Sequence, residues 1–241
     1  MSTIQTEWIE VTQRIGIPQP LDDDNLIYED GIPMESDWHQ AAMNLLINIL
    51  NYFWRSRPDV YVSGNMFVYF DPNQVKTRNF RGPDFFVVKG VADKNRWRQA
   101  WVVWQEGGLA PDFVIELTSS STEAEDKGPK KEIYEQILRV PEYFCYNPQT
   151  DELLGWRLQA GHYVEVEANE QGWLWSEELE LWVGTWWGNH LSRPNRWLRF
   201  FDKESNLVLA EWEAEAEARQ AAEAEVARLK AKLKELGQDE D

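Results

Sequence analysis

Two carboxylates interrupt strongly apolar runs in this chain. Asp84 precedes Phe-Phe-Val-Val, and Glu116 lies within the run Asp-Phe-Val-Ile-Glu-Leu. The second run has the near-continuous apolar content of a strand that is buried on both faces, where a carboxylate costs free energy unless it is paired, protonated or bound to a cation. Each acid also has an ordinary explanation. Asp84 suits a turn before a strand, and Glu116 suits a strand end that reaches solvent or an arginine.

Lys130 is a third residue that departs from local rules. Gly128-Pro129 predicts a helix that starts at Pro129, so Lys130 and Lys131 fall in its first turn, where positive charge opposes the helix dipole. For Lys131 we favour a solvated lysine. A broken local rule without visible compensation is typical of a functional position, and we assign that interpretation to Lys130.

Together these residues predict a site for metal-dependent phosphodiester hydrolysis. Two carboxylates on adjacent strand ends can hold Mg²⁺, or Mn²⁺, through oxygen ligands. The metal ion activates a bound water and stabilises charge on a phosphoryl oxygen, and a nearby lysine positions or deprotonates that water. We therefore expect Asp84 and Glu116 to be metal ligands, and Asp84, Glu116 and Lys130 to form the catalytic set.

The elements that must position these residues follow an α/β pattern. Apolar residues at helical spacing predict a helix from Asp37 to about Arg57, and a second helix is predicted to begin at Pro129 and to end before Pro141. Alternating or β-branched runs predict strands at 60–70, 84–88, 101–104, 112–117, 142–146, 153–158, 162–167 and within 173–183. Asp112 lies four residues before Glu116, about 13 Å along one strand face, so Asp84 on a neighbouring strand is the better metal partner for Glu116.

From about Val208 the composition predicts a long helix. Its apolar residues have the spacing of a coiled-coil seam, at Ala222, Val226, Leu229, Leu233 and Leu236. The seam covers fewer than three heptads, so an amphipathic or partly disordered tail is an equal alternative. We divide the chain into an acidic lead-in (1–34), a catalytic domain (35–201) and a charged C-terminal helix (202–241) that is a candidate coiled coil.

Charge is unevenly distributed along the chain. The 241 residues carry a formal net charge of −18, which taken whole argues against a nucleic-acid partner. The first 40 residues hold nine acids and one base, and the last 40 hold twelve acids and six bases. The segment from Lys76 to Arg98 has a net charge of +5 around Asp84, where a phosphate backbone would lie. A solvated loop between strands is the alternative.

The remaining composition limits the compartment. One cysteine, Cys145, excludes an intramolecular disulfide and suits a reducing compartment. No apolar run approaches the roughly 18 residues that a bilayer span requires, and no secretory signal is readable. We expect a soluble cytoplasmic protein without a membrane partner.

The order of these motifs resembles the Uma family of putative restriction endonucleases over roughly residues 30 to 200. Five runs carry the resemblance: 61–66 (Tyr-Val-Ser-Gly-Asn-Met), 82–84 (Gly-Pro-Asp), 111–119, 126–131 and 141–144 (Pro-Glu-Tyr-Phe). The family is assigned to the PD-(D/E)xK nuclease superfamily. The resemblance therefore implies an α/β fold with a restriction-endonuclease-like core, a mixed β-sheet flanked by helices, to which the C-terminal helix is added.

The resemblance also implies roles for individual residues. By position, Asp84 matches the acid of the "PD" element and Glu116 matches the acid of the "(D/E)xK" element. Thr118 stands where the superfamily has lysine. In the Uma family a lysine at the start of the following helix is thought to substitute, and Lys130 matches that lysine. Glu35, in a helix-start region that also matches, is implied as an additional ligand.

Two functions from different classes follow. The first is a Mg²⁺-dependent endonuclease acting on DNA, in which the C-terminal helix forms a homodimer so that paired subunits cut both strands. The second is a non-catalytic interaction protein that keeps the fold, with structural acids and a partner bound by the tryptophans between 173 and 187 and by the helix. Thr118 favours the second function, whereas the presence of Asp84, Glu116 and Lys130 favours the first.

Overall fold

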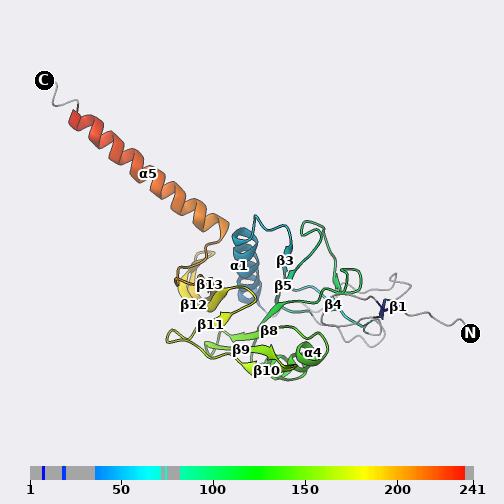
Figure 1. Ribbon diagram of the computed structural model, residues 1–241. Coiled ribbons are helices and arrows are strands. Elements are labelled where there is room, and N and C mark those ends of the chain that lie inside the picture. The colour runs from blue at the N-terminus through cyan, green and yellow to red at the C-terminus, as the bar shows by residue number, and fades with distance from the viewer. Residues whose placement is uncertain (1–6, 9–17, 20–35, 72–73, 75–81, 237–241) are drawn as a thin grey trace, which may run out of the picture.

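The computed structural model (Figure 1) describes residues 7–8, 18–19, 36–71, 74 and 82–236, and its centre is a six-stranded sheet. The strand order is β10-β9-β8-β7-β5-β3, and β7–β8 pair in parallel while the other four pairs are antiparallel. The strands are β3 (Val60–Ser63), β5 (Phe85–Lys89), β7 (Phe113–Leu117), β8 (Glu142–Asn147), β9 (Glu152–Gln159) and β10 (His162–Glu165). The predicted mixed sheet is confirmed.

Both faces of this sheet are covered. One face packs against α1 (Asp37–Phe53) and against a three-stranded antiparallel sheet of β11 (Leu174–Ser176), β12 (Leu181–His190) and β13 (Arg193–Phe201). The other face packs against α4 (Lys131–Gln136) and a parallel pair, β4 (Val68–Tyr69) and β6 (Trp101–Val102). All five residues of β7 are consequently buried, as the apolar run predicted for a central strand.

Some predicted elements differ in extent. Residues 60–70 form two strands rather than one, because the chain turns at Gly64 and Asn65, whose φ is +47°. A Cβ on Gly64 would lie 2.0 Å from the carbonyl oxygen of Asp84, so only glycine allows this close approach. The first helix ends at Phe53 rather than near Arg57, and its N-cap is Ser36, whose hydroxyl accepts a hydrogen bond from the His39 amide (3.2 Å).

The described residues of the two ends form one short strand pair and one long helix. A short antiparallel pair joins β1 (Glu7–Trp8) to β2 (Pro18–Gln19), and the rest of the acidic lead-in, with Glu35, lies outside the described residues. The predicted C-terminal helix is present as α5 (Glu211–Leu236), which projects from the body as a single helix (Figure 1). Within the described part of the chain, no helix is both long and apolar enough to cross a bilayer.

Candidate active site

Asp84 and Glu116 lie face to face on neighbouring strands. The antiparallel register pairs Phe85 with Ile115, and continuing it by one residue sets Asp84 opposite Glu116. The amide of Leu117 donates to Oδ2 of Asp84 (2.7 Å), and the amide of Asp84 donates to Oε2 of Glu116 (3.3 Å). The two carboxylates that the sequence singled out are therefore joined through the backbones of β5 and β7.

Lys130 completes the predicted set. Its Nζ lies 3.3 Å from Oε2 of Glu116 and 2.7 Å from Oδ1 of Asp126, one helical turn earlier. The Glu116 side chain is fully buried, whereas those of Asp84 and Lys130 are 19% and 21% exposed. The ammonium therefore bridges a buried carboxylate and the solvent-facing side of the site.

The local structure around Lys130 differs from the prediction. The helical run begins upstream, at α3 (Glu123–Glu125), and continues through a π turn, η1 (Asp126–Lys130), into α4. Pro129 lies inside this run and not at its start, because the wider π turn accommodates a ring that would clash with the preceding turn of an α-helix. The first-turn argument for Lys130 is therefore wrong, and its pairing with Asp126 and Glu116 replaces it.

Three further residues contact the set. Nε2 of His39, on α1, lies 2.7 Å from Oδ1 of Asp84, and the Tyr134 hydroxyl, on α4, donates to Oε1 of Glu116 (3.3 Å). Asp126 is buried beside Lys130. The spacing of Asp126, Lys130 and Tyr134, four residues each, was a readable signal of one helix face. His39 carried no comparable signal, since its contact is set by how α1 packs on the sheet.

Burial dominates the electrostatics of the site. It raises the pKa of Glu116 to about 8, with the nearby charges of Asp84 and Asp126 adding to the effect and the Lys130 ammonium opposing it. Burial likewise raises the pKa of Asp126. For Lys130 burial alone would lower the pKa, but the carboxylates of Glu116 and Asp126 outweigh it and hold the pKa above its ordinary value. Lys130 is therefore charged at neutral pH.

The carboxylates of the site offer oxygen atoms of the kind that a hard divalent cation prefers. Glu116 and Asp126 both contact the Lys130 ammonium, and Asp84 lies opposite Glu116; Mg²⁺ commonly takes one or two carboxylates together with water. Among the described residues, no group of three or more His, Cys, Asp and Glu side chains is already arranged for metal binding. Glu35, the implied additional ligand, lies outside them.

Asp112 and Thr118 have structural roles. Oδ2 of Asp112 accepts a hydrogen bond from the Lys89 amide (2.7 Å) at the other end of the strand pair, so Asp112 lies away from Glu116, as expected from their spacing. Thr118 is buried, and its amide donates to the carbonyl of Tyr146 (2.8 Å). The position that carries lysine in the superfamily is thus filled by a hydroxyl held against β8.

The basic segment does not surround Asp84 in the described residues. Its four described bases follow β5 or end it, whereas Asp84 precedes β5. Each is held within the chain: Lys89 by Glu178, Lys94 by the carbonyls of Trp54 and Arg55, and Arg96 and Arg98 by Glu106. Lys76, Arg78 and Arg81 lie outside the described residues. For those three residues, contact with a phosphate backbone stays a prediction.

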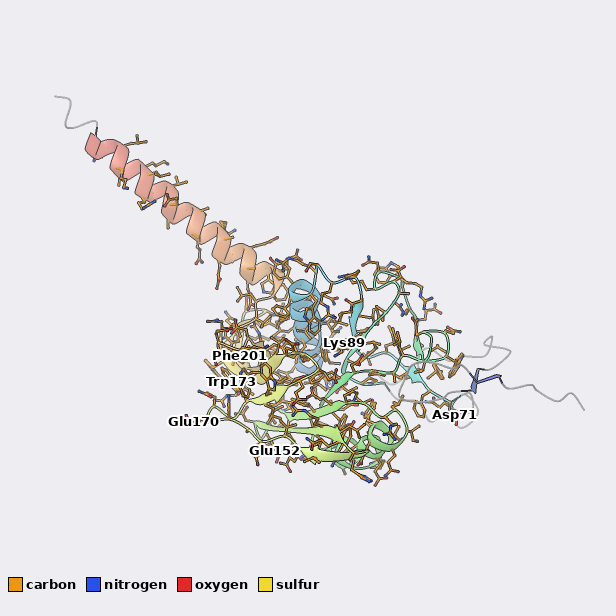
Figure 2. The ribbon with its side chains drawn as sticks, viewed as in Figure 1. Asp71, Lys89, Glu152, Glu170, Trp173 and Phe201 are labelled. Atoms are coloured by element: carbon orange, nitrogen blue, oxygen red, sulfur yellow. The ribbon has the colours of Figure 1, made fainter. Side chains whose placement is uncertain are left out.

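The tryptophan-rich stretch is mainly packing. Trp173 stacks on Phe201 with ring centroids 3.7 Å apart, and Figure 2 shows the two labelled side chains close to each other. Trp175 packs edge-on against Trp182 (5.2 Å). Trp187 is the exception at 67% exposed. These contacts favour a structural role for most of the stretch.

Comparison with known proteins assigns the family. The family model Uma2, described as "Putative restriction endonuclease", matches residues 21–190. The chain belongs to the Uma2 family. The matched residues include Asp84, Glu116 and Lys130, and also His39, Asp126 and Tyr134, which contact them.

A solved structure with a similar fold was found for comparison. It is described as a putative nuclease belonging to DUF820 from Anabaena variabilis ATCC 29413. The two are 14% identical, the likeness covers 63% of this chain and 81% of the other, and the TM-score is 0.45. No curated protein matches the chain.

Proposed function

We propose that this Uma2 protein is a Mg²⁺-dependent endonuclease that hydrolyses phosphodiester bonds of DNA, with Mn²⁺ as an alternative metal. The observation that carries the proposal is the position of Glu116, which is fully buried, opposite Asp84 and 3.3 Å from the Lys130 amine. A fully buried acid with a raised pKa, opposite a second acid and beside a lysine, is an arrangement that is concentrated at functional sites. Membership of the Uma2 family supports a nuclease reaction.

Asp84 and Glu116 would hold the metal ion, which would supply an activated water and neutralise charge on the phosphoryl group. Around them, other residues of the chain fix the two acids in place. The His39 imidazole holds one oxygen of Asp84, and the Tyr134 hydroxyl holds one oxygen of Glu116. Held in this way, the acids would lose little conformational entropy when the site binds its substrate.

Lys130 acts by charge in this proposal. Because neighbouring carboxylates raise its pKa, the ammonium keeps its proton at neutral pH and is not the base that activates water. It instead donates hydrogen bonds toward the attacked phosphate and stabilises negative charge that develops there. The partial exposure of Lys130 and Asp84 gives the phosphate its route of approach.

The proposal is tested by nicking of supercoiled plasmid in Mg²⁺ or Mn²⁺. We expect Asp84→Asn, Glu116→Gln and Lys130→Met each to lower the rate by on the order of 100-fold or more. Asp112→Asn and Lys131→Met are matched controls, since Asp112 binds the Lys89 amide and the Lys131 amine lies over the Trp156 ring. Undiminished nicking by the first three variants would show that Asp84, Glu116 and Lys130 are not the catalytic residues. Cleavage rates of single-stranded DNA and of RNA with the same sequence, measured under the same conditions, show which nucleic acid is the preferred substrate.

A non-catalytic interaction protein is the second candidate. Two observations favour it: Thr118 stands where the motif has lysine, and burial raises the pKa of Glu116, which disfavours the carboxylate form that a metal ion would need. Calorimetric titration with Mg²⁺ and Mn²⁺ separates the two candidates. The nuclease predicts metal binding that Asp84→Asn and Glu116→Gln abolish, whereas the interaction protein predicts none.

The proposed substrate also bears on compartment and assembly. A DNA substrate and the buried thiol of Cys145 both suit the cytoplasm, where thiols stay reduced. A homodimer would supply two such sites.

A further inference from the structure

The first turn of α5 is fixed to the body. Arg199, fully buried on β13, lies 2.6 Å from Oε2 of Glu213, which also accepts a hydrogen bond from the Ala210 amide (2.8 Å). The ring of Trp212 stacks on His190 at the end of β12 (5.7 Å). These contacts from both sides of the helix start give α5 a set direction away from the sheet.

The rest of α5 has no cover from the described chain. Every side chain from residue 217 to 234 is exposed, and Figures 1 and 2 show this part of the helix extending alone. Its larger apolar residues share one stripe, with Val226 50%, Leu229 48% and Leu233 69% exposed. A helix gains most of its stability from packing an apolar face, so a lone helix with such a stripe is incomplete.

Charge along α5 is divided into two opposed halves. Residues 211–225 contain six acids and one base, and residues 226–236 contain four bases and one acid. In the basic half, Lys230 and Lys234 stand four residues apart on one face, where like charges repel. Beside the apolar stripe, one edge carries Glu223 and Lys230, and the other edge carries Glu225 and Lys232. Each edge is therefore acidic first and basic seven residues later.

We propose that a second copy of this chain covers the stripe, with its α5 running antiparallel. In that arrangement Val226 packs against Leu229 of the second copy, and Ala222 packs against its Leu233, and symmetry repeats both layers. The same register sets Glu223 beside Lys230 of the other copy and Glu225 beside its Lys232. The acidic half of each helix thus lies beside the basic half of the other helix. In this arrangement Glu225 pairs with Lys232 of the second copy in place of its exposed pairing with Arg228 of its own helix.

A parallel pair of α5 helices would form fewer attractive charge contacts between the two copies. In register, it would set Leu229 against Leu229 and Leu233 against Leu233, but the acidic halves would lie side by side, as would the basic halves. Across the stripe only Glu225 and Lys230 of the two copies would attract. The charge pattern therefore selects the antiparallel pair, and the proposal is independent of any nuclease activity.

The first test is the mass of the full-length protein by light scattering over a range of concentrations. We expect twice the chain mass of 28.3 kDa at high concentration, and the single mass for Leu229→Lys. Ala231→Lys is the matched control, because residue 231 lies on the opposite face of the helix from the stripe, and it should leave the dimer intact. A single mass for the unmodified protein at every concentration overturns the proposal, as does a dimer that Leu229→Lys does not weaken.

The second test fixes the direction by exchanging charges. Lys230→Glu alone should weaken the dimer by at least tenfold in dissociation constant, because the introduced carboxylate would then face Glu223 of the other copy. Adding Glu223→Lys restores attraction only in the antiparallel pair, whereas adding Glu225→Lys restores it only in the parallel pair. Recovery with Glu223→Lys supports the proposal. Recovery with Glu225→Lys instead, or with neither, overturns the antiparallel arrangement. Unchanged circular dichroism shows that each variant still folds.

Discussion

At the scale of single residues, the site depends on how the charge of Glu116 is balanced. The carboxylate receives hydrogen bonds from the Asp84 amide and the Tyr134 hydroxyl and lies beside the Lys130 amine, yet burial and two neighbouring acids keep its pKa near 8. Burial therefore favours the protonated form of this side chain in the metal-free protein. A bound cation would displace that proton, so metal affinity should rise with pH.

This proton makes the stability of the metal-free protein depend on pH. Burial raises the pKa of Glu116 from its ordinary 4.5 to about 8, so between these limits the folded state binds more protons than the unfolded state does. The stabilising effect is complete below about pH 4.5 and is lost as the pH rises toward 8. We expect the free energy of unfolding in urea, with chelator present, to fall by about 1 kcal/mol per pH unit in this window.

Glu116→Gln should flatten that slope, since the amide does not titrate. Glu125→Gln, a change at an exposed acid nearby, serves as the control and should keep the slope. An equal slope in the Glu116→Gln protein would mean that another group, such as Asp126, holds the proton.

Some of these residue contacts were readable from the sequence. An acid within an otherwise apolar run identified Glu116, and a second run of the same kind identified Asp84, because burial makes such acids conspicuous. His39 could not be identified in this way. Its contact with Asp84 depends on how α1 crosses the sheet, which the spacing of residues within the helix does not specify.

At the scale of elements, the π turn positions Lys130. It holds one residue more than an α turn would, and it brings Lys130 next to Asp126 while Tyr134 in α4 stays on Glu116. π turns of this kind are frequent at functional sites. Sequence reasoning placed a helix start at Pro129 because proline is common there, and the structure uses the same proline to widen a helix that is already under way.

Deleting Gly128 should therefore move Lys130 away from its contacts with Asp126 and Glu116 without unfolding the chain. Without that residue the segment would close to an ordinary α turn, which shifts the Lys130 ammonium relative to Asp126 and Glu116. We expect plasmid nicking to fall on the order of 100-fold, with circular dichroism unchanged. Gly128→Ala is the control: a Cβ there has no neighbour within 4 Å, so activity should be kept. A deletion variant of normal activity would show that the π turn is not needed.

The anchor of α5 is a second element with a measurable contribution. Removing Glu213 would leave the guanidinium of Arg199 buried without its carboxylate partner. We expect Glu213→Ala to lower the free energy of unfolding by about 3 kcal/mol in urea titrations. Glu215→Ala changes an exposed acid two residues further along and should have an effect below about 0.5 kcal/mol. Equal effects of the two changes would contradict the anchoring role.

Prediction of the elements themselves was uneven. The central strands and α1 followed from apolar spacing. The long hairpin of β12 and β13 did not, since residues 184–201 mix tryptophans, glycines and arginines in an order without a clear period. One reason is that glycines there make room for tryptophan rings. A Cβ at Gly184 would lie 2.1 Å from the ring of Trp173.

At the scale of the whole molecule, the net charge of −18 opposes a DNA substrate at long range. The described bases between residues 89 and 98 are engaged within the chain, so binding should involve few phosphates and be weak. The acidic lead-in contributes to this repulsion through its charge alone. Removing some of its charges therefore measures how strongly the repulsion weakens DNA binding.

Replacing Asp22, Asp23 and Asp24 by asparagine should strengthen DNA binding roughly threefold at low salt, as measured by fluorescence anisotropy with a labelled duplex. The difference should vanish at high salt, where charges separated by more than a few ångströms are screened. The control replaces Gln13, Gln19 and Asn25 by alanine, which leaves the charge unchanged. A gain that persists at high salt would indicate a direct contact instead of long-range repulsion.

The length of α5 limits what a pair of these molecules does to one duplex. In the antiparallel pair the two helix starts lie roughly 50 Å apart, at 1.5 Å per residue, which is about 15 base pairs of B-DNA. Each helix start carries one body with its own site, so the paired helices would hold the two bodies apart. The dimer would therefore not cut both strands at one position. It would make two distant nicks on one DNA molecule or hold two DNA segments side by side.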